Sequence, residues 1–262
     1  DEDWILRHLS RASGLKGWAL AIGCGSKPLP WMNDSDCIGF MQWALPQLRM
    51  RWAGFRRVRK QVCKRIARRL RVLGLPGLDA YRVYLGANPN EWIALDRCCR
   101  ITVSRFYRDH RVFDFLGETV LPVLAKQALQ RGDNCLQLWS AGCAGGEEPY
   151  SLALLWHRRV YPLWPGVGLQ ILATDSDPRN LERAAAACYS PASLKDLPAE
   201  WRKTAFRRRN EEYCLLPGYR SGVVFGCQDL RRRMPAGRFD LILCRNLVFT
   251  YFSTSLQQQL LA

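Results

Sequence analysis

The spacing of apolar residues divides the chain into a helical part and a later part in which strands and helices alternate. Before residue 130, apolar side chains recur every three or four positions, which predicts helices over 41–48, 55–73, 78–85, 91–99 and 113–128. Short apolar runs typical of buried strands follow at 136–139, 169–175, 223–225 and 239–244, with helical segments from 149, over 180–187 and over 252–262. This alternation predicts an α/β fold.

A run of small residues joins the first predicted strand to the next helix. It contains Gly142, Gly145 and Gly146, and glycine allows a sharp turn and the close approach of a ligand to the backbone. Glu147 and Glu148 begin the helix and would repel a phosphate, although a helix N-terminus otherwise attracts anions. The loop therefore predicts a crevice for a cationic or hydroxyl-bearing ligand. The alternative is an ordinary strand-to-helix turn.

The second predicted strand ends in an acidic residue, Asp175. An acid at this place in an α/β sheet commonly accepts hydrogen bonds from the hydroxyl groups of a ribose. The alternative is that Asp175 and Asp177 only cap the helix that follows.

The net charge of the chain predicts a binding partner. The chain has 262 residues and a formal net charge of +16, which indicates an acidic partner. Much of the charge lies on the helix predicted over 55–73, where no acidic residue separates Arg56, Arg57, Arg59, Lys60, Lys64, Arg65, Arg68, Arg69 and Arg71. A solvated basic face is the alternative, but so large an excess of cations repels itself unless an acidic molecule is near.

The number and spacing of cysteines and histidines indicate the redox state of the thiols and whether a metal is bound. Eleven cysteines are scattered without a Cys-x-x-Cys pair, and there are only three histidines, so we expect reduced, mostly buried thiols and no metal. Neither a secretory leader nor a run of membrane-spanning length is visible, which predicts a cytoplasmic protein without membrane insertion. The sequence does not begin with methionine and stops within a predicted helix, so we expect a fragment of a longer protein.

Four motifs follow one another along the chain. They are Phe106-Tyr-Arg108, Trp139-Ser-Ala-Gly-Cys-Ala-Gly-Gly-Glu-Glu-Pro-Tyr-Ser151, Ala173-Thr-Asp175 and Phe239-Asp-Leu-Ile-Leu-Cys-Arg-Asn246. With these motifs, residues 40–262 resemble the CheR-type chemotaxis-receptor methyltransferases, which transfer methyl groups from S-adenosyl-L-methionine (SAM) to protein glutamates.

The resemblance implies a Rossmann-like SAM-dependent methyltransferase domain preceded by a small all-helical N-terminal domain. We expect an extension over 1–38, a basic helical domain over 39–100, a linker and helix over 101–134, and the SAM-binding domain over 135–262, whose last strands are missing. The implied product is S-adenosyl-L-homocysteine. The implied substrate is an acidic helical protein, such as the cytoplasmic domain of a chemoreceptor, and we expect a monomer.

The family motifs also assign residues by position. Arg108 and Tyr251 would be catalytic, and the cofactor would contact Thr102, Ser104, Arg108, Gly142, Glu147 (or its neighbour Glu148), Asp175, Asp229, Leu230, Asn246 and Leu247. Of these, Asp229 and Leu230 would flank the adenine. The basic helix would attract the substrate through Arg56, Arg57, Arg59 and Lys60. A glutamate carboxylate is already ionised at neutral pH, so no general base is required, and Arg108 can hold one carboxylate oxygen while the other attacks the methyl group. The alternative is that Arg108 only forms a surface salt bridge with Asp109.

The chain departs from the family pattern in three places. Thr250 occupies the counted position of the active-site tyrosine, and Tyr251 serves only if the turn bulges. Asp229 replaces the asparagine that is usual before Leu230. The segment between residues 189 and 223 is short for a β subdomain that docks on receptor tails, so tethering to such a tail is not predicted.

Two other functions fit parts of the sequence. A nucleic-acid methyltransferase would also use a basic helix, but we find neither an Asn/Asp-Pro-Pro-Tyr motif nor a basic strand with interleaved aromatic residues. A SAM-binding adaptor without catalysis is supported only by the shifted position of Tyr251.

Overall fold

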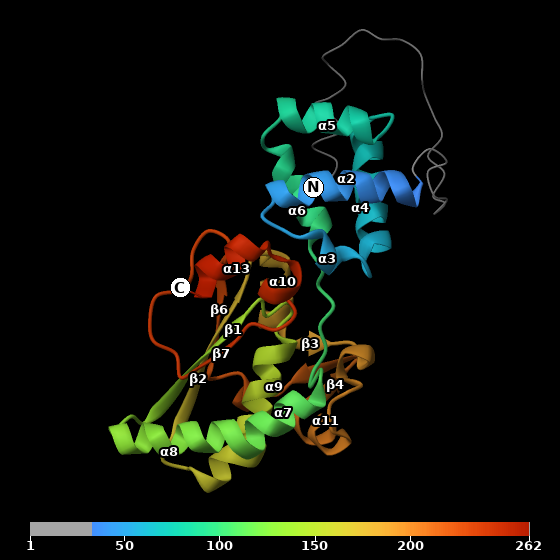
Figure 1. Ribbon diagram of the computed structural model, residues 1–262. Coiled ribbons are helices and arrows are strands. Elements are labelled where there is room, and N and C mark those ends of the chain that lie inside the picture. Colours follow the sequence, from blue (N-terminus) through green and yellow to red (C-terminus); the bar gives the residue numbers. More distant parts are fainter. Residues whose placement is uncertain (1–32, 262) are drawn as a thin grey trace.

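The computed structural model describes residues 33–261, and its first part is entirely helical (Figure 1). The helices of this part are α2 (Asp34–Gln47), α3 (Trp52–Phe55), α4 (Arg59–Leu73), α5 (Leu78–Ala87) and α6 (Glu91–Cys99). They enclose one hydrophobic core, in which Phe40, Ile66 and Tyr81 are fully buried. Most of the extension predicted over 1–38 lies outside the described residues.

The basic helix predicted over 55–73 is divided, which corrects the prediction. α3 ends at Phe55 and α4 begins only at Arg59, so Arg56 lies in the turn between them. α3 packs closely on a segment distant in sequence, because a Cβ atom on Gly54 would collide with the carbonyl group of Thr250. The apolar stripe of the helix, including Ile66 and Leu70, is buried as its spacing predicts.

The second part contains a sheet of four parallel strands in the order β6-β2-β1-β7. The strands are β1 (Cys135–Ala141), β2 (Gly168–Asp175), β6 (Val223–Cys227) and β7 (Leu241–Leu243). Side chains alternate between the two faces of β1, so Leu138 joins one hydrophobic cluster and Trp139 another. The strand order is that of a Rossmann-like sheet, and the predicted α/β fold is confirmed.

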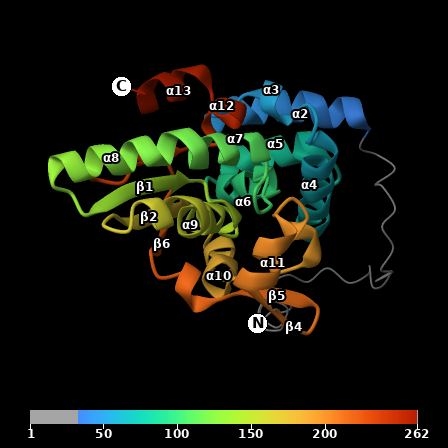
Figure 2. The same cartoon turned by 90° about the horizontal axis from the view of Figure 1, so that it is seen from below.

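Helices cover both faces of this sheet. The helices on the Leu138 side are α7 (His110–Phe115), α8 (Leu121–Arg131), α9 (Glu147–Leu155) and α10 (Pro178–Ala186), with π-helical turns η2 (Leu116–Val120) and η3 (Trp156–Val160) and a 3-10 turn η4 (Tyr161–Leu163). Figure 2 shows that α7 and α8 form one continuous run alongside β1. On the Trp139 side, α12 (Val248–Tyr251) and α13 (Thr254–Leu261) contribute Val248 and Leu256. No helix within residues 33–261 has the length and apolar character that crossing a membrane requires.

A small antiparallel sheet follows α10, in the order β3-β5-β4. Its strands are β3 (Cys188–Tyr189), β4 (Phe206–Arg209) and β5 (Glu212–Leu215), accompanied by η5 (Pro191–Leu194), α11 (Ala199–Ala205) and η6 (Pro217–Tyr219). The short segment therefore does form a β subdomain. Few residues are needed because β4 and β5 form a hairpin whose turn has only two residues. Asn210 in this turn has φ +56°, as tight hairpin turns require.

Two disulfides correct the prediction of reduced thiols. Cys37–Cys63 joins α2 to α4, and Cys188–Cys214 joins β3 to β5. Each pair is separated by 26 residues and becomes adjacent only on folding, so no local spacing indicated it. The other cysteines of the described residues are free: Cys98, Cys99, Cys135, Cys143, Cys227 and Cys244. Within residues 33–261, no three side chains of His, Cys, Asp or Glu are placed so that they could hold a metal ion.

Candidate functional site

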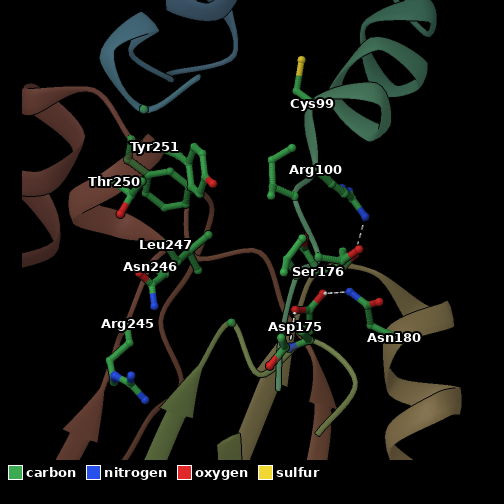
Figure 3. A pocket seen from close by; sticks show the side chains of 18 of the residues that line it. Cys99, Arg100, Asp175, Ser176, Asn180, Arg245, Asn246, Leu247, Thr250 and Tyr251 are labelled. Atoms are coloured by element: carbon green, nitrogen blue, oxygen red, sulfur yellow. Dashed lines mark hydrogen bonds between the residues drawn. The ribbon is translucent and has the colours of Figure 1, made fainter. Parts of the chain in front are cut away.

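A cavity of about 480 Å³ lies between the helical part and the carboxyl ends of the parallel strands. This is where open α/β sheets bind their ligands, beside the strand at which the order reverses. Most of the predicted cofactor and catalytic residues line it: Thr102, Ser104, Arg108, Gly142, Asp175, Asp229, Leu230, Asn246, Leu247 and Tyr251. In Figure 3, Arg245 to Tyr251 form one wall, and Arg100, Asp175 and Ser176 lie opposite.

The loop after β1 is fixed by its backbone. The N–H groups of Gly142 and Cys143 both donate to the carbonyl of Thr174, at 2.7 and 2.9 Å, which ties the loop to the end of β2. Gly142 has φ +78°, and a Cβ atom there would lie 2.5 Å from Cδ2 of Leu247. Glycine is needed at this position both for the backbone conformation and for the space.

Asp175 ends β2 with its carboxylate held in a fixed orientation. Its Oδ2 accepts from the backbone N–H of Ala144 at 2.9 Å. Its Oδ1 accepts from the backbone N–H of Asp177 at 2.8 Å and from the side-chain amide of Asn180 at 3.2 Å. The following helix is capped by Asp177, whose side chain accepts from the N–H of Arg179. Asp175 therefore braces the glycine loop and still lines the cavity, whereas helix capping belongs to Asp177.

The two acidic residues that begin α9 have different surroundings. Glu148 lines the cavity, accepts from Ser140 at 2.8 Å and pairs with Arg245 at 3.2 Å. Burial raises its pKa, and the charge of Arg245 acts in the opposite direction. Glu147, which the family motif assigns to the cofactor, is 1% exposed, pairs with Arg183 at 2.8 Å and does not belong to the cavity wall.

The linker that carries Arg108 is anchored by its aromatic motif. Phe106 and Tyr107 are buried, and the N–H of Tyr107 donates to Oγ of Ser151 at 2.9 Å. Arg108 follows, with a one-third exposed side chain that donates to the carbonyl of Val103 at 2.8 Å. The neighbouring Asp109 has φ +60°, in the left-handed region that Asp adopts more readily than most residues other than glycine.

Arg245 fixes the position of Arg108 from the opposite wall. Its guanidinium donates to the carbonyl of Arg108 at 2.8 Å and to Asp109 at 2.6 Å, besides its contact with Glu148. It also lies over the ring of Phe113 at 5.2 Å. Sequence reasoning did not select Arg245, although its place between Cys244 and Asn246 at the end of a strand was a usable signal.

Tyr251 and Thr250 both line the cavity. Tyr251 ends the single turn of α12, and its ring packs against Phe55 of the helical part at 5.0 Å between centroids. Burial raises the pKa of its phenol above the ordinary value. Thr250 lies beside it, and its carbonyl accepts from Arg51 at 3.3 Å.

Of the four basic residues predicted to bind the substrate, Arg57 alone lines the cavity. Arg56 and Lys60 are exposed nearby, whereas Arg59 is paired with Asp34 at 2.9 Å. The ion pair leaves Arg59 less available to a partner than the other three.

Known proteins match the part of this chain that contributes most of the cavity residues. A family model described as "CheR methyltransferase, SAM binding domain" matches residues 102–262. A chemotaxis protein methyltransferase of Listeria monocytogenes is 39% identical over 159 residues, which are 61% of this chain and 57% of that protein. One of Salmonella typhimurium is 32% identical over 211 residues, or 78% of this chain and 69% of that protein. A 104.1 kDa protein from the hypE 3′ region of Rhodobacter capsulatus is 36% identical over 202 residues, 76% of this chain but only 21% of that protein.

Proposed function

Because this chain belongs to the CheR methyltransferase family, we propose that it transfers the methyl group of SAM to glutamate side chains of an acidic helical protein. The chain spans 57% of the Listeria relative and 21% of the Rhodobacter relative. The activity and the substrate are therefore proposals. The observation that carries the proposal is that three motif segments, around Arg108, Asp175 and Asn246, meet at one cavity.

The side chains of the cavity fit SAM. The carboxylate of Asp175 lies in the cavity wall, where it is available to accept a hydrogen bond from a ribose hydroxyl, and Gly142 lets the loop pack closely on Leu247. Of the two acidic residues that begin α9, Glu148 lines the cavity and provides a carboxylate on the side of a cofactor whose sulfur is positively charged. When bound, SAM supplies an electrophilic methyl group.

The remaining work of the protein is to hold the acceptor carboxylate. A glutamate is ionised at neutral pH and needs no base. The guanidinium of Arg108 remains charged and matches the two oxygens of a carboxylate, so it can hold one oxygen while the other faces the methyl group. Arg245 keeps the backbone of Arg108 in place, and the phenol of Tyr251 can donate a further hydrogen bond. Enclosing the carboxylate also removes the water that would weaken its attack.

Charge and the relatives support a proposal for the substrate and its location. Arg56, Arg57 and Lys60 favour an acidic surface, and the named relatives are chemotaxis methyltransferases, so we propose the cytoplasmic domain of a chemoreceptor as the substrate. The protein would then act as a monomer in the cytoplasm. We also propose that the chain is divided into domains at the boundaries predicted from its sequence.

Incubation with methyl-labelled SAM and chemoreceptor-bearing membranes tests this function. Label is expected on protein and should be released by alkali, because a glutamate methyl ester is base-labile. Arg108→Ala should lower the transfer rate by about 100-fold or more, since positioning of the acceptor is lost. Arg111→Ala, which changes an exposed arginine outside the cavity wall, should have little effect. Alkali-resistant label on RNA, or SAM binding without transfer, would contradict the proposal.

A further inference from the structure

A cluster of charged side chains joins the helical part to the loop after β6. Arg231 of that loop donates to both oxygens of Asp96 on α6, at 2.5 and 3.0 Å. The same guanidinium donates to both oxygens of Asp229, at 3.0 Å from Nε and 2.7 Å from a terminal nitrogen. Arg231 thus forms two-pronged contacts with two carboxylates at once, the geometry for which arginine is best suited.

The cluster is largely withdrawn from water. The side chains of Arg231, Asp96 and Asp229 are 13%, 9% and 20% exposed. Arg231 also donates to the carbonyl of Leu48 at 3.3 Å. Asp96 accepts in addition from Arg100 at 3.2 and 3.3 Å. Two arginines therefore balance two carboxylates, and removing one member would leave a buried charge without its partner.

The cluster separates the cavity from a groove on the outside. Asp96, Arg100, Asp229 and Arg231 line both the cavity and a neighbouring groove of about 650 Å³. Leu230, which the family motif places beside the adenine, lies between Asp229 and Arg231 and is 6% exposed. Arg231 thus connects the loop that carries Leu230 to α6.

The contact between Arg231 and Asp229 compensates the negative charge of Asp229. An asparagine at this position would carry no charge, whereas a carboxylate beside the buried Leu230 needs a counter-charge. Hydrogen bonds from Arg231 keep the pKa of Asp229 below its ordinary value against the opposing effect of burial, so the group remains ionised. Without Arg231, the two carboxylates would repel each other and displace the loop.

We propose that Arg231 is a positioning residue, which holds Asp229 and Leu230 at the adenine end of the cavity and fixes that end relative to α6 through Asp96. The proposal rests on the proposed function, because the adenine belongs to SAM.

Calorimetric binding of SAM to this chain, together with steady-state kinetics, tests the role of Arg231. Arg231→Met should raise the Kd and KM for SAM by about 10- to 100-fold while kcat at saturating SAM stays within about threefold, since Arg108 and Tyr251 lie elsewhere. Adding Asp229→Asn removes the unpaired charge and should recover most of the lost affinity. Arg232→Met, an exposed neighbour outside the cavity wall, should bind SAM like the wild type.

The possible outcomes separate this inference from the proposed function. If Arg231→Met does not fold, Arg231→Lys keeps the charge but loses the two-pronged geometry, and it should also weaken SAM binding. Unchanged affinity in the folded variants, or loss of affinity that Asp229→Asn does not relieve, would overturn the positioning role alone. A wild-type chain that binds no SAM would overturn the proposed function and this inference with it.

Discussion

Tyr251 and Thr250 illustrate what one residue contributes to the site. The two are neighbours in the sequence, yet the single turn of α12 lets both line the cavity. Tyr251 is held by its ring, which packs on Phe55, and burial keeps its phenol protonated because the pKa is raised. A protonated phenol can donate a hydrogen bond, so we propose that Tyr251 rather than Thr250 supplies the group expected from the family.

We expect Tyr251→Phe to lower kcat by about tenfold, the usual effect of losing one hydrogen bond to a charged group. The Kd for SAM should change little, because the ring and its packing are kept. Thr250→Val is the matched control and should have the smaller effect. Since the phenol stays protonated, activity should not fall between about pH 7 and pH 9 through its ionisation. A larger loss of activity in Thr250→Val than in Tyr251→Phe would contradict this assignment.

At the scale of one element, α4 has two kinds of basic residues. The first turn and the residues before it lie beside the cavity, where Arg57 forms part of the wall and Arg56 and Lys60 are exposed. Lys64 and Arg68 lie further along the same helix and outside that wall. A substrate that reaches the cavity should therefore depend on the first group and much less on the second.

Replacing Arg56, Arg57 and Lys60 by Gln should raise the KM for the receptor substrate about tenfold at low ionic strength. The increase in KM should be smaller in roughly 0.5 M salt, because salt screens exposed charges. Replacing Lys64, Arg68 and Arg71 by Gln removes the same charge and serves as the control. Equal effects of the two triple variants on KM would show that only net charge matters and would refute a local binding role.

At the scale of the whole molecule, the cavity exists because two parts of the chain are fastened together. The N–H of Arg51 donates to the carbonyl of Tyr251 at 2.8 Å, and Ser253 donates to the carbonyl of Arg49 at 2.8 Å. Met50 and Phe252 form an isolated antiparallel bridge between them. The helical part therefore forms a wall of the site and is not only an appendage.

The Cys37–Cys63 disulfide stabilises that helical part by restricting its unfolded chain. Replacing both cysteines by Ser should cost about 3 kcal/mol, which for a protein of this size lowers Tm by roughly 6 to 12 °C. Cys227→Ser, at an exposed free thiol, is the control and should leave Tm unchanged. Scanning calorimetry without reductant measures the difference. Alkylation of Cys37 and Cys63 in the unreduced, denatured protein would contradict the disulfide.

The sequence by itself determined those features that depend on local spacing. A period near 3.6 marked α5 and α6, and apolar runs marked β1 and β2, because each pattern reflects one element facing one core. The motif strings indicated the glycine loop and Asp175 at the carboxyl ends of strands. These ends meet at one edge of any parallel sheet, so the location of the cavity followed as well.

Only the tertiary structure decided the contacts between distant residues. Asp96 and Arg231 are 135 positions apart, and each disulfide pair is 26 apart, so no local pattern could connect them. The close packing of Gly54 on Thr250 likewise joins residues far apart in the sequence. Burial and charge pairing also separated Glu147 from Glu148, although the sequence shows them as equivalent neighbours. Charge balance and close packing depend on which surfaces meet, and that is settled only when the chain has folded.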